Sequence, residues 1–400
     1  MRRRATLLLA LAALAAPAQA VAADRPPPVP GAKAAIVIDG RDGEVMFGKR
    51  VGARREIAST TKLMTALLTL ERTRPRQVFK ASGYRPAPVE SQIGLRPGER
   101  MRVSDLFEAL MLESANDAAE ALAEGISGSR ARFVAAMNAR AKELGLDDTS
   151  YANPIGLDDP ANYSTARDLA ALAFDLMQRP RFARVVDTPA AQLESGARPR
   201  VVDNRNTLVA DYPFVDGVKT GHTTQAGYVL IGAAHGRGGG RVISVVMGEP
   251  SEAARDADTL KLLRWGLGRF HRVRVLDTSR PLDRADIEYR DEQVALVPKR
   301  GVVLTLRDGQ RVRRAVNAPD QVSGPLAAGA RAGAVTVFVD GERVRRVPLV
   351  TAEAVPDAGT LRMLVSVLGV PLTVIAVLAI LLGVALLALR LRVRLRLVKR

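Results

Sequence analysis

The sequence of 400 residues contains no cysteine and three histidines. The lack of cysteine excludes disulfides, thiolate nucleophiles and cysteine-ligated metals, so packing alone must stabilise any exported domain. The histidines are scattered and no H-E-x-x-H motif is present, so we expect no catalytic zinc and no other metal site. Aromatic residues make up 4% of the chain and are not interleaved with a basic stretch, which argues against a nucleic-acid partner.

The N-terminus has the layout of a secretory signal peptide. "MRRR" is followed by the short apolar run "ATLLLALAALAA" and by small residues at Ala18-Gln19-Ala20. This run is too short for a comfortable membrane span, which favours a cleaved signal over an uncleaved anchor. We therefore expect a signal peptide over residues 1–23, cleaved after Ala20 or Ala23, and a stiff proline-rich leader over 24–31.

The C-terminal apolar run is longer. Met363 to Leu389 contains 27 residues without a charge, enough for about 40 Å of helix. Six cations follow in residues 390–400, and a cationic flank marks the cytoplasmic side of a span. The sequence therefore predicts a linker at 358–362, a transmembrane helix at 363–389 and a cytoplasmic tail at 390–400. The chain between the signal and this helix would lie on the extracytoplasmic face of the cell membrane.

The formal net charge is +17, and +8 remains once Arg2–Arg4 and the six cations of the tail are set aside. This positive charge on the exported part suits an anionic envelope polymer or a lipid surface. Nucleic acid remains a poor alternative, because the chain is expected to be exported.

The exported part has strand patterns at both ends of a helical middle. Two short strands are expected in 32–50, and the apolar runs 227–236 and 240–249 should pair as a hairpin. Helical spacing with start and stop signals predicts helices over 56–71, 102–126, 129–146, 165–179 and 254–270. One sheet built from distant parts of the chain implies an α+β, three-layer domain over 32–270 rather than a run of βαβ units.

Residues 271–357 have a different texture, in which short β-type runs alternate with turn residues. Asp308-Gly309 and Asp340-Gly341 are hairpin signals, and helical periodicity is missing up to about Gly359. We expect a separate small antiparallel β domain there.

Ser59 and Lys62 lie one helical turn apart in the helix predicted for 56–71. The turn would bring Lys62 Nζ over Ser59 Oγ, and burial would lower the lysine pKa towards neutrality, as a base for a serine nucleophile requires. Backbone N–H groups at the helix N-terminus could also serve an oxyanion. Taken alone, the pattern equally fits a capping serine and a lysine that reaches solvent; Ser104 is a similar cap candidate for 102–126.

Two further motifs carry polar groups. Ser114-Ala115-Asn116 would present a hydroxyl and an amide together at a break of the helix 102–126, or would be an ordinary polar step on a surface helix. Lys219-Thr220-Gly221 stands at the head of the apolar strand 227–236, where its glycine permits close approach of a ligand backbone, or forms a turn leading into the hairpin.

In this order, Ser-x-x-Lys, Ser-x-Asn and Lys-Thr-Gly form the signature set of penicillin-binding proteins and serine β-lactamases. "KTGHTTQAGY", "SANDAAEALAE", "NPIGLDD" and "RVISVVMGEPSEAARDADTLKLLRWG" resemble a D-alanyl-D-alanine carboxypeptidase of the low-molecular-mass penicillin-binding type, from Ala32 to about Phe270. The resemblance implies a three-layer α/β/α fold of the β-lactamase/transpeptidase type. "GPLAAGARAGAVTVFVDGERVRRVPLV" resembles the C-terminal β-sandwich domain of that family. Members commonly end in an amphipathic membrane-surface helix, and the long apolar run of this chain departs from that pattern.

The resemblance implies a role for each residue of the first two motifs. Ser59 would attack the carbonyl of the penultimate D-Ala of a peptidoglycan stem pentapeptide and form an acyl-enzyme. Lys62, neutral before the attack, would take the hydroxyl proton. Ser114 would relay that proton to the leaving D-Ala, and Asn116 would hold Lys62 and the substrate amide.

The third motif would bind substrate. Lys219 would keep the local potential positive and favour a neutral Lys62. Gly221 belongs to the same binding motif, and the oxyanion would lie between the backbone N–H groups of Ser59 and His222. Thr220 matches a position that holds the terminal carboxylate.

Arg255 matches a second position that holds this carboxylate, although it could equally form an exposed ion pair with Glu252 or Asp258. The resemblance also implies acylation and inhibition by β-lactam antibiotics, and it implies no cofactor.

Three alternative functions share part of this motif pattern. A class A β-lactamase needs a glutamate that activates the deacylating water, and no glutamate occurs between Glu143 and Glu194. A non-catalytic peptidoglycan-binding relative predicts loss of the nucleophile or its lysine, and both are present. A transpeptidase differs only in the acceptor that reaches the acyl-enzyme, and the motifs do not decide between amine and water.

Overall fold

The computed structural model describes residues 27, 28 and 30–397. The predicted signal peptide, most of the leader and the last three residues of the basic tail lie outside the described residues. The chain divides into two compact units, with the boundary between His271 and Arg272.

The first unit is built on a five-stranded sheet in the order β2-β1-β11-β10-β9, and every pairing is antiparallel. Its strands are β1 (Ala34–Asp39), β2 (Val45–Lys49), β9 (Val215–Thr223), β10 (Gly227–His235) and β11 (Arg241–Glu249). The first strand of the unit pairs with the last, in the register Ala34↔Met247 to Asp39↔Val242. The predicted sheet from distant parts of the chain, including its hairpin, is therefore confirmed.

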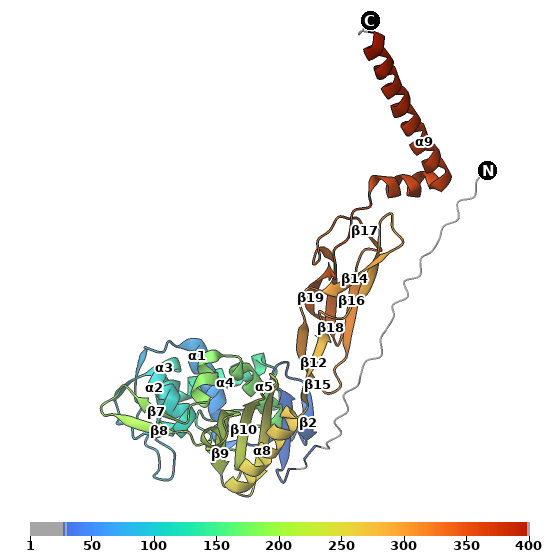
Figure 1. The fold of residues 1–400 in the computed structure, drawn as a ribbon. Helices are drawn as coiled ribbons and strands as arrows, with labels where there is room; N and C mark the ends of the chain where they lie inside the picture. Colours follow the sequence, from blue (N-terminus) through green and yellow to red (C-terminus); the bar gives the residue numbers. More distant parts are fainter. Residues whose placement is uncertain (1–26, 29, 398–400) are drawn as a thin grey trace, which may run out of the picture. The chain divides into compact units, whose positions relative to one another are not determined.

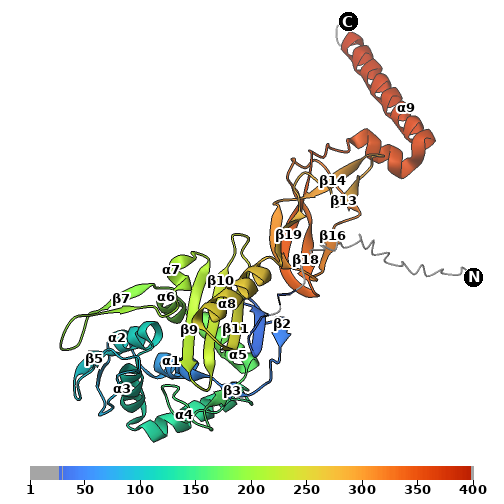
Figure 2. The same ribbon diagram turned by 90° about the horizontal axis from the view of Figure 1, so that it is seen from below.

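Both faces of this sheet are covered. All residues of β1 are buried. Ile36 and Val37, which follow each other within β1, belong to two separate hydrophobic cores on opposite faces of the sheet. α5 (Ala166–Met177) packs over the core that contains Ile36, and α8 (Glu252–Leu267) packs over the core that contains Val37. The expected three-layer α/β/α arrangement is confirmed (Figures 1 and 2).

The other helices of this unit contribute to the α5 side of the core, apart from the short α7. They are η1 (Ala58–Thr61), α1 (Lys62–Arg72), α2 (Val103–Glu108), the π-helical turn η2 (Ala109–Glu113), α3 (Asn116–Ser127), α4 (Arg130–Glu143), α6 (Pro180–Val186) and α7 (Leu208–Asp211). Three two-stranded ribbons complete it: β3 (Arg55–Glu56) with β6 (Tyr163–Ser164), β4 (Val78–Lys80) with β5 (Arg100–Arg102), and β7 (Ala190–Leu193) with β8 (Arg200–Asp203). The predicted helices are present, while α6 and α7 were not predicted.

Neither serine expected to cap a helix does so. Ser59 lies inside η1, whose N-cap is Ile57, and Ser104 lies in the first turn of α2, whose N-cap is Arg102. Neither N-cap makes a side-chain capping bond. Ser104 instead donates to the neighbouring carboxylate of Asp105. The hydroxyl of Ser59 is thus available for another use.

The second unit is a two-layer β structure. β12 (Phe270–Leu276) pairs with β15 (Val302–Arg307), and a six-stranded sheet has the order β16-β18-β19-β14-β13-β17. The strands of the larger sheet are β13 (Asp283–Ile287), β14 (Gln293–Pro298), β16 (Val312–Asn317), β17 (Gln321–Val322), β18 (Arg331–Val339) and β19 (Glu342–Thr351). Leu276 of β12 shares a core with Val335 and Val347, as expected for a small β-sandwich.

One of the two hairpin predictions in this unit is wrong. Asp340 and Gly341 have positive φ angles of 51° and 92° and join the paired strands β18 and β19 in a tight hairpin. At Asp308-Gly309 the chain also turns, but β15 and β16 then enter different sheets, so no hairpin forms. A D-G step specifies the turn and not the partner of each strand.

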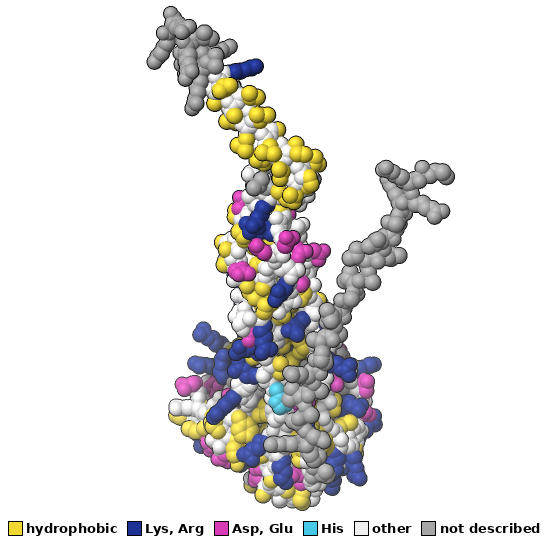
Figure 3. Space-filling model, turned by 45° about the vertical axis from the view of Figure 1, so that its right-hand side comes forward, with side chains coloured by type: hydrophobic (Ala, Val, Ile, Leu, Met, Phe, Trp, Pro, Cys, Tyr) yellow, Lys and Arg dark blue, Asp and Glu magenta, His cyan; other side chains and the backbone are white. Residues whose placement is uncertain are grey.

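α9 (Thr360–Leu397) is interrupted at Gly369, whose φ of 74° and ψ of 159° are not helical. The helix expected over 363–389 is therefore broken near its start, at Gly369 two residues before Pro371. The stretch Leu368–Leu391 has 24 residues and a mean hydropathy of 3.0, long and apolar enough to cross a membrane. Figure 3 shows its largely hydrophobic surface.

Candidate active site

Lys62 lies directly beneath Ser59 at the start of α1. Its side chain is fully buried, and Nζ donates to Ser59 Oγ at 3.0 Å. Nζ also donates to Asn116 Oδ1 at 2.6 Å and to the backbone oxygen of Ile155 at 2.5 Å. Burial holds the pKa of Lys62 well below its ordinary value, and the charge of Lys219 lowers it further. Lys62 therefore loses its proton more readily than an exposed lysine does.

Ser114 stands at the break between η2 and α3. It is 4% exposed, and its φ of 63° is left-handed, so the helix is interrupted at this residue. Its Oγ has no hydrogen-bond partner among the described residues. The predicted helix over 102–126 therefore breaks where the motif was expected to present its hydroxyl and amide.

Asn116, at the first position of α3, links Lys62 to a loop. Its Oδ1 accepts from Lys62, while Nδ2 donates to Glu90 Oε2 at 2.6 Å. Glu90 also accepts from the Tyr84 hydroxyl at 2.5 Å and from the backbone N–H of Ala87 at 3.0 Å. Burial opposes ionisation of Glu90, but these bonds outweigh it and lower its pKa.

The segment after Asn153 packs against the turn that carries Ser59 and contacts Lys62. Asn153 Oδ1 accepts from the backbone N–H groups of Ile155, Gly156 and Leu157, which curls the chain and aims the Ile155 carbonyl at Lys62. Gly156 has a φ of +90°, and a Cβ there would lie 2.0 Å from the backbone oxygen of Ala58. Only glycine permits this approach.

The Lys-Thr-Gly motif lies within β9, which pairs with β10 along its length. The expectation that the motif precedes an apolar strand is corrected: it belongs to a strand of its own at the sheet edge. A Cβ on Gly221 would lie 3.2 Å from Ser59 N, so the glycine lets β9 pass against the turn that carries Ser59. Lys219 is 1% exposed and Thr220 is 8% exposed.

Lys219 is not simply a permanent cation. Burial lowers its pKa to about 7, and the charges of Arg205 and Arg255 contribute to that shift. Its Nζ donates to the backbone oxygen of Thr220 at 3.0 Å. Arg205 pairs with Glu113, the residue before Ser114, and so brings a further cation to the site.

His222 and Arg255 meet the same aromatic ring. The exposed His222 stacks on Tyr228, with ring centroids 4.0 Å apart, and the Arg255 guanidinium lies 6.0 Å from the Tyr228 centroid. Arg255 is 3% exposed and pairs with Glu252 at 2.7 Å and with Asp256 at 2.8 Å. The expected exposed ion pair with Glu252 is therefore buried at the arginine.

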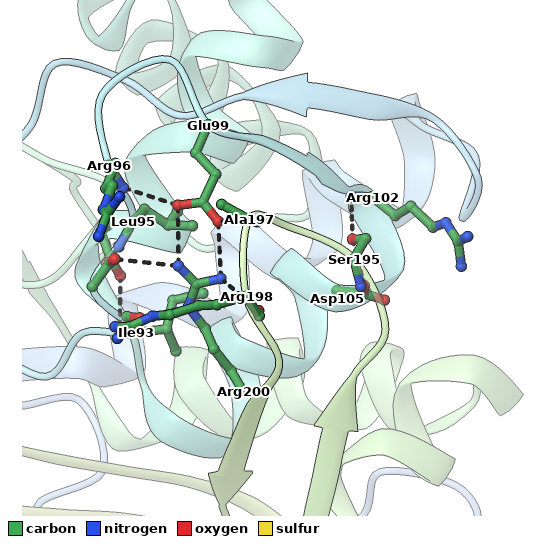
Figure 4. A network of polar contacts seen from close by, with 12 residues as sticks. Ile93, Leu95, Arg96, Glu99, Arg102, Asp105, Ser195, Ala197, Arg198 and Arg200 are labelled. Carbon is green, nitrogen blue, oxygen red and sulfur yellow. Dashed lines mark hydrogen bonds and ion pairs between the residues drawn. The ribbon is translucent and has the colours of Figure 1, made fainter.

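A buried ion pair secures the loop that carries Glu90. Arg200 donates to both oxygens of Glu99 and to the backbone oxygens of Ile93 and Gly94 (Figure 4). These bonds lower the pKa of Glu99 to about 2, although burial opposes them. The same segment is held from the other side by Asp117, which accepts from Ile93 N at 3.1 Å.

The sequence motifs did not identify several residues of this site. Glu90 lies in a stretch without periodicity, and Ile155 contributes a backbone atom that no residue type signals. Asn153 and Gly156 could have been suspected, since Asn-Pro and Gly in one loop mark a tight turn. Among the described residues, no group of three or more His, Asp or Glu side chains is arranged to hold a metal ion.

Two family models match the chain. The model described as D-alanyl-D-alanine carboxypeptidase matches residues 20–251, and that of the penicillin-binding protein 5 C-terminal domain matches residues 270–357. The D-alanyl-D-alanine carboxypeptidase DacF of Bacillus subtilis (strain 168) is 31% identical over 353 residues, covering 84% of this chain and 89% of that protein.

Solved structures show the same likeness. Penicillin binding protein 5 from Haemophilus influenzae has a TM-score of 0.60 and 30% identity, covering 83% of this chain and 100% of its own. The Streptomyces K15 DD-transpeptidase has a TM-score of 0.57 and 32% identity, covering 61% of this chain and 100% of its own. The protein of Streptomyces sp. (strain K15) is also named D-alanyl-D-alanine carboxypeptidase, at 36% identity over 242 residues, 56% of this chain and 83% of that protein.

Proposed function

The chain belongs to the D-alanyl-D-alanine carboxypeptidase family and is a serine-type hydrolase with that activity, and we propose that Ser59 carries the acyl group in its reaction. The substrate would be the D-Ala-D-Ala end of a peptidoglycan stem pentapeptide. The observation that carries the proposal is the set of three oxygens around Lys62 Nζ.

A neutral lysine has two N–H bonds and one lone pair. The Ile155 oxygen can only accept, and Asn116 presents its oxygen, so these two neighbours take the two N–H bonds. The lone pair then faces the third neighbour, the Ser59 hydroxyl, 3.0 Å away. In the neutral state Ser59 is therefore the donor, and Lys62 is placed to remove its proton.

Attack and proton movement follow from this placement. As Ser59 Oγ bonds to the carbonyl carbon of the penultimate D-Ala, its proton passes to Lys62 Nζ. When the C–N bond breaks, the leaving D-Ala nitrogen takes a proton through Ser114, whose buried Oγ has no partner among the described residues. Water then cleaves the ester and regenerates Ser59.

The oxyanion and the terminal carboxylate of the substrate would be bound at β9. The backbone N–H groups of Ser59 and His222 would hold the oxyanion, helped by the close passage of β9 at Gly221. Thr220 and Arg255 would hold the carboxylate, with Lys219 adding positive charge whenever it is protonated. The buried Arg255 keeps two carboxylate partners, so a substrate carboxylate would have to compete with Glu252.

β-Lactams would acylate the same hydroxyl, because they place a strained amide carbonyl where the peptide carbonyl would lie. The test is labelling of the full chain in detergent with a fluorescent penicillin, followed by mapping of the labelled peptide. We expect labelling at Ser59 and none in Ser59→Ala or Lys62→Arg. Labelling that persists in Ser59→Ala, or that maps to another serine, would overturn the assignment.

We further propose that Leu368–Leu391 of α9 spans the membrane, with the basic tail in the cytoplasm and with the catalytic domain and the β domain outside. The length and hydropathy of this stretch and the cations that follow it support this topology. An N-terminal signal peptide over residues 1–23 would direct the export. Protease added to intact spheroplasts should remove the catalytic unit and spare a C-terminal epitope tag; protection of the catalytic unit would contradict the topology.

A second activity has one specific observation in its favour, the two names of the Streptomyces K15 relative. Transpeptidation would use the same acyl-enzyme with an amine as acceptor. Incubation of the enzyme with a stem pentapeptide and a free D-amino acid separates the two, since hydrolysis gives tetrapeptide and transfer gives an exchanged pentapeptide.

A further inference from the structure

An arginine strip crosses three adjacent strands of the β unit. It consists of Arg313 and Arg314 on β16 and Arg343, Arg345 and Arg346 on β19. In the sheet register Phe338 of β18 lies opposite both Arg313 and Arg343, and Val337 lies opposite both Arg314 and Arg345. Successive residues of a strand point to opposite faces, so Arg313 and Arg343 share one face of the sheet and Arg314 and Arg345 share the other. The strip therefore wraps around this end of the sheet.

All five arginines of the strip are exposed. Within the part of the chain that the structure describes, none of the five guanidinium groups forms an ion pair. Arg313 lies over the Phe338 ring at 4.5 Å, which leaves its guanidinium at the surface. Arginines on β16 and β19 are two strand spacings, or about 10 Å, apart, so their repulsion is uncompensated at low salt.

Protection of a sheet edge explains part of the strip. Charged side chains on an edge strand hinder pairing with another chain, and β16 is an edge of the six-stranded sheet. This accounts for Arg313 and Arg314. β14 pairs only with Leu349–Thr351, so the first half of β19 is also unpaired on that side, and the same protection applies to its three arginines. Charge of either sign protects an edge, so this role does not explain why all five residues of the strip are cations.

We propose that the arginine strip binds the free carboxylates of peptidoglycan stem peptides and so holds the enzyme on the polymer that carries its substrate. Planar guanidinium groups bind carboxylates through two parallel hydrogen bonds, and a repeating polyanion can engage several at once. The inference rests on the proposed stem-peptide substrate. The arginines occupy the first half of β19, whereas the chain continues toward α9 from its other end at Thr351. This arrangement favours a wall polymer over a lipid headgroup.

The test measures co-sedimentation of the full chain, in neutral detergent, with purified sacculi freed of phosphate polymers. Arg343→Gln/Arg345→Gln/Arg346→Gln should bind about tenfold more weakly at low salt, with a flatter salt dependence, since three exposed charges are lost. The matched control is Arg272→Gln/Arg280→Gln/Arg284→Gln, which removes the same charge from exposed positions of the same unit and should bind like the wild type.

Hydrolysis of a soluble stem pentapeptide separates this inference from the proposed function. Both triple variants should keep the wild-type rate, and a wild type that fails to hydrolyse the peptide would reject the function and not the strip. Equal losses of sacculus binding in the two triple variants would overturn the strip. So would a strip variant that keeps binding to sacculi and loses binding to vesicles of anionic phospholipid.

Discussion

The carboxylate of Glu90 accepts a hydrogen bond from Asn116 Nδ2 at 2.6 Å, and this bond fixes which way the amide faces. A carboxylate can only accept, so Nδ2 must point to Glu90 and Oδ1 to Lys62. If the amide were reversed, Nδ2 could donate only to the lone pair of Lys62 and would occupy the base. Glu90 is thereby a positioning residue for the proposed proton transfer from Ser59.

We therefore predict that Glu90→Gln slows acylation by a labelled penicillin by about tenfold or more, a part of the effect of a general base. Glutamine can donate as well as accept, so the Asn116 amide is no longer held. The charge of Glu90 also raises the pKa of Lys62, and its removal should move the acidic limb of the pH–rate profile to lower pH.

Tyr84→Phe is the control for Glu90→Gln, because it removes one bond to the carboxylate and keeps the charge. It should leave the acidic limb at or above its wild-type position. A Glu90→Gln enzyme that is merely less stable would lose rate equally at all pH values, and such a profile would contradict the orienting role.

Site residues could be predicted from the sequence where their contact depends on spacing along one helix. Residues whose position depends on the course of a loop could not be predicted. Ser59 and Lys62 are one turn apart, so helix geometry alone predicts their contact. Glu90 lies 26 residues before its partner Asn116, in a stretch whose course is set by Asp117 and Arg200. No local pattern records which residue of such a loop faces inward.

The same limit explains the errors in the β unit and in α9. The alternation of β15 and β16 is satisfied in either sheet, so the turn at 308–309 does not specify pairing. Gly369 and Gly383 stand in the same apolar run, yet only Gly369, two residues before Pro371, is non-helical. Tertiary neighbours decide the strand pairing, and the nearby proline decides where the helix breaks. The hydropathy pattern contains information on neither.

Gly156→Ala should disable the turn that carries Ser59. The new Cβ would overlap the backbone oxygen of Ala58 at 2.0 Å and approach Ser59 N at 2.9 Å, at a φ of +90°. Backbone strain of this kind costs about 1–3 kcal/mol before the overlap is counted. We expect a lower thermal midpoint and acylation reduced by about a hundredfold, because small displacements of a nucleophile are costly.

Gly145→Ala is the matched comparison, since Gly145 has a φ of +69° and no atom within 4 Å of the added Cβ. It carries the conformational cost without the overlap and should acylate at the wild-type rate. Equal acylation by the two variants would show that the Ala58 contact is unimportant.

Glu99→Gln should destabilise the unit that contains the active site. The Glu99–Arg200 pair is buried, at 3% and 7% side-chain exposure, and breaking such a pair typically costs about 3–5 kcal/mol. The folded pKa of Glu99, about 2, lies below its unfolded value. Its stabilisation is therefore present above the unfolded pKa and is lost as the pH falls toward 2.

Urea unfolding of the full chain in detergent at pH 7 and pH 3 measures this difference. Wild type and Glu99→Gln should differ more at pH 7. Glu143→Gln removes a carboxylate that is 63% exposed and pairs with Arg140, and it should change the midpoint little at either pH. A Glu99→Gln midpoint as high as that of Glu143→Gln at pH 7 would refute the structural importance of the buried pair.

Glu120→Gln should stabilise the protein at alkaline pH. Glu120 lies one turn after Asn116, is 2% exposed, and has Arg130 at 3.4 Å as its ion-pair partner. Burial raises its pKa to about 7, so between the unfolded pKa and pH 7 the folded state binds the extra proton. The stability from this proton is present below the unfolded pKa and is lost as the pH rises through 7.

Glutamine mimics the protonated side chain at every pH, so the Glu120→Gln variant should gain on the order of 1–3 kcal/mol at pH 8 and little at pH 4. The thermal midpoint at the two pH values measures this gain in stability, with Glu124→Gln, at an exposed position of the same helix, as the control.

Since the Glu120 charge also raises the pKa of Lys62, Glu120→Gln should move the acidic limb of the pH–rate profile of acylation to lower pH. A variant whose stability follows the wild-type pH dependence would show that folding does not raise the pKa of Glu120.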